Sequence, residues 1–354
     1  VKAVREPEAG QLGLEVLETE LTAFGVDGSF APPPPGPEGL GRVLLNAERI
    51  DYLLAERSDR GARSADLQVT DYTLTARIPR NNPTGDRRVS LQTGFVAATL
   101  ANEMTPEADA GAAAAQPVGG YGGKIDLSAE TGAALLVVED GQLSASTTID
   151  EIGLRLTPTD PDVALRGAAA VDRLDVSVAQ PVDDQATDGA PLSMRLAAGI
   201  LELDDDAWAA LDPEGALKRV GAEFHAEMKG RMRAGAPGRL GWRGIETLEA
   251  DIFLSALDAK LDGDVDLAFD PDGQPAGSGQ VRFVNSMSLL RDLITSGLLS
   301  PQQAEIGFVL AGRFTKPGDQ PEELVSDIAI DRGFLMVNGE PLIPLPALPV
   351  PAIE

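Results

Sequence analysis

The sequence predicts a mainly β protein with large antiparallel sheets, arranged either as a sandwich or as one curved, extended sheet. Segments in which apolar and polar residues alternate recur about every 8–14 residues, which is the rhythm of antiparallel strands. Several of these segments end at turn sequences such as Glu139-Asp140-Gly141 and Asp270-Pro271-Asp272-Gly273. Helical periodicity is limited to short stretches, so we expect few helices.

Three segments near the N-terminus, residues 12–21, 65–79 and 91–102, are predicted strands. Residues 65–79 give the clearest signal, because they alternate and are rich in β-branched residues. Residues 40–55 fit either a helix or a strand. The proline-rich residues 31–37 predict an extended linker, and the alanine- and glycine-rich residues 105–123 predict a flexible surface loop.

From residue 124 onward the strand signal dominates. Predicted strands cover residues 125–127, 134–138, 142–149, 152–157, 163–168, 174–178 and 192–203. Turns are predicted at 130–132, 139–141 and 158–162, and a loop at 182–191. Because side chains alternate between the two faces of a strand, the resulting sheet has one apolar face.

A short helix is predicted over residues 205–211, where the chain passes from one β-rich half to the other. Asp204 or Asp205 caps its first turn. Asp212-Pro213 ends it, because the residue before a proline avoids the helical conformation. Trp208 is expected to be largely buried, and the acidic residues 204–206 are expected to cap the helix rather than to bind a metal.

Residues 220–232 are predicted to form a strand, because residues 222–228 alternate without interruption. Phe224, Ala226 and Met228 share one side of this strand. A helix is the alternative, since Leu217, Val220, Phe224 and Met228 also fit one helical face.

Further strands are predicted at residues 248–257, 259–269, 279–284, 307–314, 324–330 and 334–337. Two helices lie among them. Residues 288–299 carry one apolar stripe after an N-cap at Ser286 or Ser288. Residues 301–305 follow Ser300, with Pro301 at the first helical position and Gln303 three residues after the cap.

The predicted organisation has four parts. Residues 1–38 form an N-terminal extension with the proline-rich linker, residues 39–203 and 204–346 form two β-rich halves, and residues 347–354 form an extended tail. The chain begins at Val1 rather than at a methionine, which fits removal of a signal peptide.

The composition excludes several kinds of chemistry and partner. A net charge of -27 repels phosphate backbones and anionic headgroups, so no nucleic-acid partner is expected. The absence of cysteine excludes disulfides and thiol catalysis. The single histidine, His225, excludes two-histidine mechanisms. No apolar run approaches the roughly 20 residues of a membrane-spanning helix.

No group of residues has the pattern of a catalytic, cofactor or metal site, so none is predicted. Asp262, Asp264 and Asp266 have the spacing of a calcium loop, but Leu267 and Gly273 stand where that loop needs glycine and glutamate. The three aspartates are instead expected on the solvated face of a strand.

His225 is expected to be exposed on the polar face of its strand, among Glu223, Glu227 and Lys229. Ser144, Ser146 and Ser255 lack a nucleophile-elbow motif. A pair of carboxylates acting as a hydrolase is the enzymatic alternative.

The predicted helices are too short to cover a large sheet. A helix of about 12 residues spans about 18 Å. The apolar face must therefore pack against a second sheet, as in a sandwich, or leave a groove that binds something.

Several segments carry a family resemblance: Trp208-Ala-Ala-Leu-Asp-Pro-Glu-Gly-Ala-Leu217, the strand pair at 248–269, residues 288–303 and residues 324–339. In these the chain resembles the alphaproteobacterial domain-of-unknown-function family 2125. Lys218-Arg219 depart from the pattern, which has a proline there. The resemblance implies a periplasmic protein with an extended antiparallel β fold and no assigned activity. A looser similarity, in strand rhythm only, is to bridge-like lipid-transfer proteins.

We therefore expect a non-enzymatic periplasmic protein that acts as a structural or partner-binding module, with a protein partner in the cell envelope. The alternative is a carrier that binds a lipid or other apolar ligand in a groove of the sheet. A carboxylate-based hydrolase is a third alternative.

Overall fold

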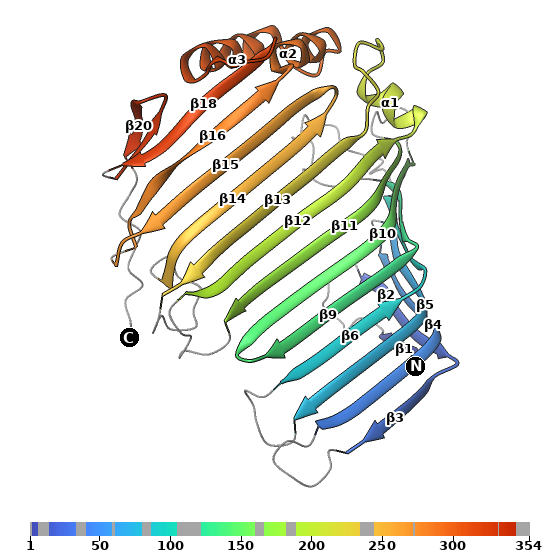
Figure 1. Cartoon of the computed structure of the whole chain (residues 1–354). Helices are drawn as coiled ribbons and strands as arrows, with labels where there is room; N and C mark the ends of the chain where they lie inside the picture. Colours follow the sequence, from blue (N-terminus) through green and yellow to red (C-terminus); the bar gives the residue numbers. More distant parts are fainter. Residues whose placement is uncertain are drawn as a thin grey trace.

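Most of the segments with period-two alternation form strands of one antiparallel sheet in the computed structural model of the chain (Figure 1). The structure describes residues 2–5, 14–32, 40–58, 61–79, 86–104, 122–159, 166–181, 189–233, 244–271, 273–331 and 333–344. The prediction of a mainly β protein is confirmed. The sheet takes the extended, curved form, and the strands within the described ranges form no second layer and hence no sandwich.

The strands are numbered along the chain. Those before the first helix are β1 (Lys2–Arg5), β2 (Leu14–Phe24), β3 (Asp27–Ala31), β4 (Leu40–Ser58), β5 (Gly61–Pro79), β6 (Arg87–Thr93), β7 (Val96–Met104), β8 (Gly123–Ala129), β9 (Thr131–Glu139), β10 (Gln142–Pro158), β11 (Gly167–Pro181) and β12 (Ala190–Leu203). Those after it are β13 (Ala222–Met232), β14 (Ile245–Ala256), β15 (Ala259–Phe269), β16 (Pro275–Val284), β17 (Lys316–Pro317), β18 (Glu323–Asp331), β19 (Phe334–Val337) and β20 (Glu340–Pro344). The helices are α1 (Asp205–Leu211), α2 (Ser286–Thr295) and α3 (Pro301–Phe314).

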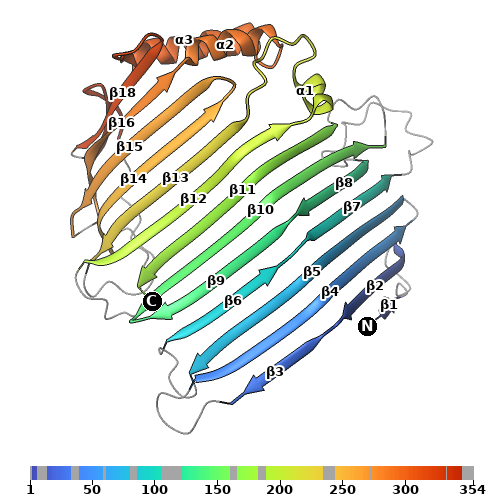
Figure 2. The same ribbon diagram turned by 45° about the vertical axis from the view of Figure 1, so that its right-hand side comes forward.

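Neighbouring strands of the sheet are mostly consecutive in sequence (Figure 2). From β9 to β16 each strand pairs with the next, and β16, β18, β19 and β20 complete that edge. The β12–β13 pairing joins the two β-rich halves into the same sheet. In the N-terminal half the long strands β4, β5 and β10 each pair with two short strands placed end to end, namely β2 and β3, β7 and β6, and β8 and β9.

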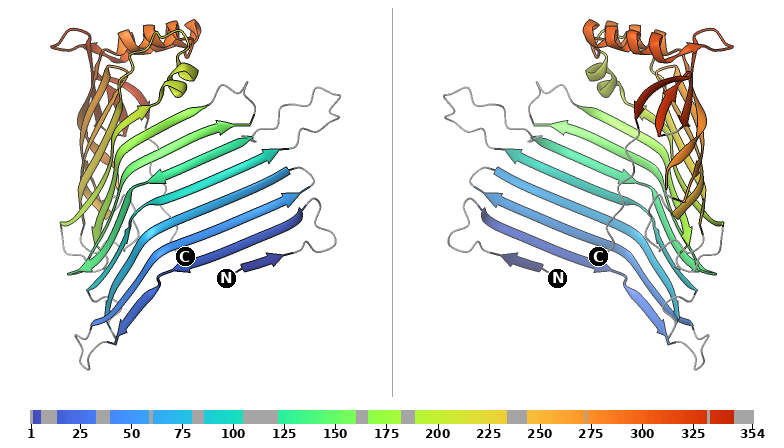
Figure 3. Two further views of the ribbon diagram at one scale, coloured as in Figure 1. Left: turned by 90° about the vertical axis from the view of Figure 1, so that its right-hand side faces the viewer. Right: turned by 90° about the vertical axis from the view of Figure 1, so that its left-hand side faces the viewer.

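The long strands bend where the short ones meet, and we call this the bend line (Figure 3). Asp71 of β5 and Glu151 of β10 lie on it with left-handed φ angles of 50° and 52°. The pairing of β4 with β5 and of β10 with β11 keeps one register across these positions, so Asp71 and Glu151 are not extra residues. Their left-handed conformation instead changes the side to which the following side chains point. In β10 the apolar positions are accordingly odd-numbered up to Ile149 and even-numbered from Ile152. The shift keeps the apolar residues on one face across the bend.

Acidic side chains lie over two glycines at the bend line, Gly94 between β6 and β7 and Gly199 in β12. A Cβ atom added to Gly94 would overlap the side chain of Asp71, and one added to Gly199 would overlap the side chain of Asp172. A side chain at either position would therefore displace the aspartate that lies over it. The bend also explains why the predicted strand at 91–102 is two strands, β6 and β7, separated at Gly94.

Helix α1 confirms the predicted helix at 205–211 with its boundaries. The Asp204 carboxylate accepts a hydrogen bond from the Ala207 N–H at 2.8 Å, and the helix ends at Asp212. Trp208 is buried, with 7% of its surface exposed, as predicted. The strand predicted over 220–232 is also confirmed, and its helical alternative is not adopted.

Helix α2 confirms the predicted helix at 288–299 with shifted ends. It covers residues 286–295, and Asn285, with a left-handed φ of 58°, is the N-cap residue in place of Ser286 or Ser288. No side-chain hydrogen bond caps this end.

The prediction of a strand over 307–314 is wrong, because the predicted helix at 301–305 continues to Phe314 as α3. Its capping box is present as predicted: the Gln303 N–H donates to Ser300 Oγ at 3.3 Å, and the Ser300 N–H donates to Gln303 Oε1 at 3.0 Å. Contacts with α2 favour the helix beyond residue 305, and this packing is not encoded in the local alternation.

The three helices of the described residues lie at the same end of the strands, and none of them covers a face of the sheet (Figures 1 and 2). A small core lies at the opposite end of the strands, formed by Leu192, Met232, Ile245, Leu248 and Phe269. None of the helices in the described ranges has the length and apolarity needed to cross a bilayer.

Some predictions fall outside the described residues. These are the greater part of the linker at 31–37, the loop at 105–123 except its last two residues, most of the turn at 158–162, the first half of the strand predicted at 163–168, most of the loop at 182–191, and the tail at 347–354.

Candidate functional site: an apolar face across the sheet

One line of directly opposed residues crosses almost the whole sheet and is apolar throughout. We call it the central row, and it takes one residue from each successive strand between β3 and β19. Its members are Phe30, Val43, Ala76, Val89, Leu136, Ala145, Val178, Met194, Met228, Ala250, Val265, Gly279, Ile328 and Val337. Because opposed residues in antiparallel strands point to the same side, these side chains form one continuous band.

A second row runs beside the central row on the same face, two residues further along each strand. Its members are Gly28, Leu45, Leu74, Leu91, Ala134, Thr147, Val176, Leu196, Ala226, Ile252, Gly263, Val281 and Ser326. Thr147 is the one polar side chain before the end of the row at Ser326. We call the side of the sheet that carries both rows the apolar face.

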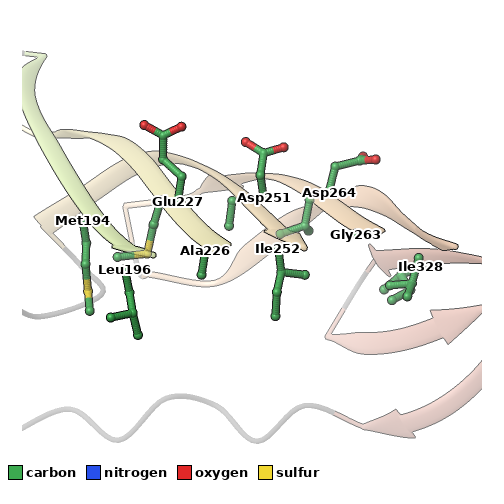
Figure 4. Close-up of a pocket in the computed structure, with 13 residues that line it drawn as sticks. Met194, Leu196, Ala226, Glu227, Asp251, Ile252, Gly263, Asp264 and Ile328 are labelled. Atoms are coloured by element: carbon green, nitrogen blue, oxygen red, sulfur yellow. The ribbon is translucent and has the colours of Figure 1, made fainter. Parts of the chain in front are cut away.

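The apolar face is hollowed where it crosses β12 to β18. The hollow has a volume of about 470 Å³ and is lined by residues of both rows, among them Met194, Met228, Ile252 and Ile328. Figure 4 shows Met194, Leu196, Ala226, Ile252 and Ile328 pointing to one side of the sheet, and Glu227, Asp251 and Asp264 to the other. A space of this size is in the range of small-molecule binding sites, roughly 300–1,000 Å³.

One glycine, Gly263, lines this hollow, and a second, Gly279, lies in the central row beside it. Gly263 lies opposite Ile252 and Val281, and Gly279 lies opposite Val265 and Ile328. A side chain at Gly263 would meet Ile252 and Val281 of the apolar face, whereas one at Gly279 would meet the main chain of β15. The sequence alone does not show this, because it depends on the register of β14 to β18.

A third apolar row lies beyond the bend line, on the ends of the N-terminal strands that turn away from the central row. Its members are Leu21, Tyr52, Leu67, Ala98, Leu127, Leu154, Ala169 and Leu203. A further hollow of about 280 Å³ lies beside it, lined in part by Leu54, Ala65, Leu100 and Ile125. The bend thus gives the apolar surface a second wall in the N-terminal half.

The opposite face carries the acidic residues that the sequence singled out. Asp262, Asp264 and Asp266 alternate along β15 with residues of the apolar face, so they lie on the polar face as predicted. Arg282 pairs with Asp262 at 3.2 Å, and Lys229 pairs with Glu227 at 3.1 Å. The described residues contain no group of three or more potential ligands that could hold a metal ion.

His225 lies on the polar face, as predicted. The prediction that it is exposed is wrong: its side chain is half-buried, because Ala197 and Phe253 flank it on the neighbouring strands. Its Nε2 atom is buried without a hydrogen-bond partner in the described part of the chain. Ser255 lies opposite Glu223, two pairs along from the His225–Phe253 pair.

Two other serines weighed from the sequence, Ser144 and Ser146, lie on β10, four strands from Ser255 on β14. The serines are therefore not brought together around the histidine.

The carboxyl group of Asp204, at the start of α1, has a shifted pKa. Hydrogen bonds with the backbone of Ala168 and Ala207 lower the pKa of this carboxyl below its usual range. The charged form therefore suits its position as a helix cap, as expected for an aspartate at a helix N-terminus.

The comparisons with known proteins give a family and no more. Residues 140–346 match a family model described as an uncharacterised protein conserved in bacteria, DUF2125. The matched range begins in the β9–β10 turn and extends past β20, so it includes the larger hollow. No curated protein and no solved structure matches the chain.

Proposed function

The chain belongs to the DUF2125 family of bacterial proteins, and from this premise we propose that it is a carrier that binds a lipid, or another ligand with long apolar chains, along its apolar face. The observation that carries the proposal is the central row, in which successive strands present apolar residues at opposed positions without a polar interruption.

The dimensions suit an elongated ligand. Neighbouring strands are about 4.8 Å apart, so a row that crosses more than a dozen strands is on the order of 60 Å long. An acyl chain could lie along such a row at any point. Burying a methylene group contributes about 0.8 kcal/mol, so a half-covered chain of about 16 carbons gains on the order of 6 kcal/mol.

The chemistry of the face favours acyl chains over a protein surface. The backbone donors and acceptors of these strands are used within the sheet, and the side chains of the two rows offer almost no hydrogen-bonding groups. Protein interfaces concentrate their binding energy in tryptophan, tyrosine and arginine. The central and second rows contain none of these and consist of aliphatic and small residues, methionine and one phenylalanine.

A variant with a charge on the apolar face tests the proposal. Val265→Glu places a carboxylate at the hollow, and Ser146→Glu is the control because it adds the same charge to the polar face of β10. Lipid bound to each purified protein is measured by native mass spectrometry and by titration with a fluorescent fatty acid. We expect binding by the wild type and Ser146→Glu, and at least tenfold weaker binding by Val265→Glu. Equal binding by all three proteins would contradict a site on this face.

A protein-binding module, the function favoured by the sequence, is the second candidate. Strand β3 supports it: among the described strands it pairs with β4 alone, all five of its residues are exposed, and it contains no lysine or proline to protect a sheet edge. A partner strand could add to this edge. Phe30→Pro and Ser29→Pro should then abolish recovery of a partner from envelope extract, while Pro344→Ala on the other edge should not.

We propose the periplasm as the location. The absence of cysteine is compatible with an oxidising compartment, where a free thiol is a liability. Fractionation of cells that express the natural gene, followed by immunodetection, tests this location.

A further inference from the structure

Helix α3 exposes apolar residues along one stripe. Gln302, Ile306, Val309 and Arg313 recur at helical spacing and are all exposed. Ile306 and Val309 have exposed fractions of 56% and 64%. The other side of the helix is packed: Ala304 is 1% exposed, so the exposed stripe is not a consequence of a loosely attached helix.

The connection between α2 and α3 adds to this surface. Leu298 lies in it with 45% of its surface exposed. We call Leu298, Ile306 and Val309 the hairpin patch. These are aliphatic side chains, whereas the side chains that dominate protein–protein hot spots are mainly tryptophan, tyrosine and arginine.

The hairpin is electrically neutral in a strongly acidic protein. Between residues 286 and 314, Arg291 and Arg313 balance Asp292 and Glu305, while the whole chain has a net charge of -27. The hairpin can therefore approach an uncharged surface without repulsion, and the rest of the protein is repelled by an anionic one.

The position of the hairpin connects this patch with the apolar face. Helix α2 contacts β15, one of the strands that the larger hollow crosses. Figure 3 shows α2 and α3 projecting from the edge of the sheet, to the same side as the bent ends of the N-terminal strands. An apolar surface resting on the hairpin would therefore lie next to one side of the proposed binding face.

We propose that the α2–α3 hairpin docks on the surface of a lipid bilayer, with the hairpin patch entering the boundary between headgroups and acyl chains. In this proposal the bilayer supplies the lipid that the apolar face binds, or receives it. This part of the proposal rests on the carrier function proposed above. Because the hairpin is neutral and the protein is acidic, it should prefer zwitterionic to anionic bilayers.

Vesicle flotation of the full chain tests the docking. The probes are vesicles of phosphatidylcholine alone and of phosphatidylcholine with about one-third phosphatidylglycerol. Val309→Glu and Ile306→Glu are compared with Val26→Glu, a control in which an equally small apolar residue, 54% exposed in the β2–β3 connection, receives the same charge.

We expect the wild type and Val26→Glu to float with phosphatidylcholine vesicles, and less with the anionic ones. Each hairpin variant should reduce the partition coefficient at least tenfold, equivalent to about 1.4 kcal/mol. The double variant Ile306→Ser/Val309→Ser removes the apolar surface without a charge and should behave in the same way if either glutamate variant fails to fold. Unchanged flotation of the hairpin variants, or no flotation of the wild type, overturns the proposal.

Titration with a fluorescent fatty acid in the absence of vesicles separates docking from ligand binding. A wild-type protein that binds the fatty acid but does not float disproves the docking and leaves the carrier function intact. One that floats through the hairpin but binds no fatty acid disproves the carrier function alone. A partner protein that is recovered with the wild type and Val26→Glu but lost with the hairpin variants, in a protein that floats with no vesicles, assigns the patch to a protein partner and overturns the docking.

Discussion

Asp251 of β14 lies directly opposite Asp264 of β15 on the polar face of the sheet. Glu227 of β13 faces Asp251 from the other side, so carboxylates occupy one row on successive strands. Among the described residues the structure shows no ion pair for Asp251 or Asp264. Like charges at directly opposed positions destabilise a sheet, and the polar face therefore carries unfavourable interactions that substitution can relieve.

Replacing Asp251 with lysine should stabilise the protein. The new ammonium group would lie between Glu227 and Asp264, with an expected gain of about 0.5–1 kcal/mol in the free energy of unfolding. Urea denaturation of Asp251→Lys, Asp251→Asn and the wild type measures the gain, with the largest value for lysine. A lysine variant less stable than the asparagine variant would show that repulsion among the carboxylates of Glu227, Asp251 and Asp264 does not lower the stability.

Removing the N-cap of α1 should lower the free energy of unfolding by an amount that depends on pH. Asp204→Ala removes the hydrogen bond to the Ala207 N–H, at an expected cost of about 1 kcal/mol at pH 7. The folded-state pKa of Asp204 is lowered, so its contribution is fully present above the unfolded pKa of about 3.9 and is lost as the pH falls through the folded value.

Denaturation of Asp204→Ala and the wild type at pH 7, 5 and below 3.5 measures this effect. The difference between the two proteins should be the same at pH 7 and pH 5 and should shrink only at the lowest pH. Asp205→Ala, an exposed acidic residue in the same turn, is the matched control. A difference that persists unchanged in acid would rule out the charged cap as its cause.

The two glycines Gly263 and Gly279, which lie in neighbouring rows of the apolar face, should differ in their tolerance of a side chain. A Cβ at Gly279 would overlap the main-chain oxygen of Asp264, which cannot move without disturbing the sheet. A Cβ at Gly263 would lie 3.0 Å from Cγ2 of Ile252, a side chain that can shift. We expect Gly279→Ala to cost about 2–3 kcal/mol and Gly263→Ala less than about 1 kcal/mol. Thermal denaturation of the two variants gives the order, and the reverse order contradicts the register of β15 and β16.

Substitutions of Glu151, the left-handed residue of β10, should change the stability of the protein by amounts that depend on the new side chain. Glu151 has a φ of 52°, a conformation that is unfavourable for branched residues and free for glycine. Glu151→Val should lower the free energy of unfolding by about 1–2 kcal/mol, and Glu151→Gly should not lower it. Chemical denaturation of both variants tests this. Equal stability of the valine and glycine variants would mean that β10 runs straight through the bend line.

The strands were predictable from the sequence and their continuity was not. Alternation locates residues 142–149 and 152–157, yet the two segments belong to one strand, β10, because the left-handed Glu151 absorbs the shift between them. Helix α3 is longer than the predicted helix at 301–305 for a related reason. Residues 307–314 have a strand-like composition, and the contacts with α2 that make them helical lie outside any local window.

The sequence predicts that the sheet has an apolar face, but it does not predict which residues form a continuous row on that face. The shortage of helices left two possibilities for the apolar face, a second sheet packed against it or an open groove. Its continuity depends on which residues lie opposite each other, such as Met194 and Met228 or Gly279 and Ile328. Register is fixed by the bends and turns of the folded sheet, and no single segment contains that information.

The arrangement of the sheet also determines how it loses its structure. Past β10 each strand contacts chiefly its two neighbours, so stability is a sum of local interfaces, as in repeat proteins. Such a sheet opens from its edges, and the strands around Leu192 and Phe269, which share the small core, open last. A long ligand across many strands binds only when all of them are in place. It would therefore couple their separate opening equilibria, so that the loaded protein unfolds more cooperatively than the empty one.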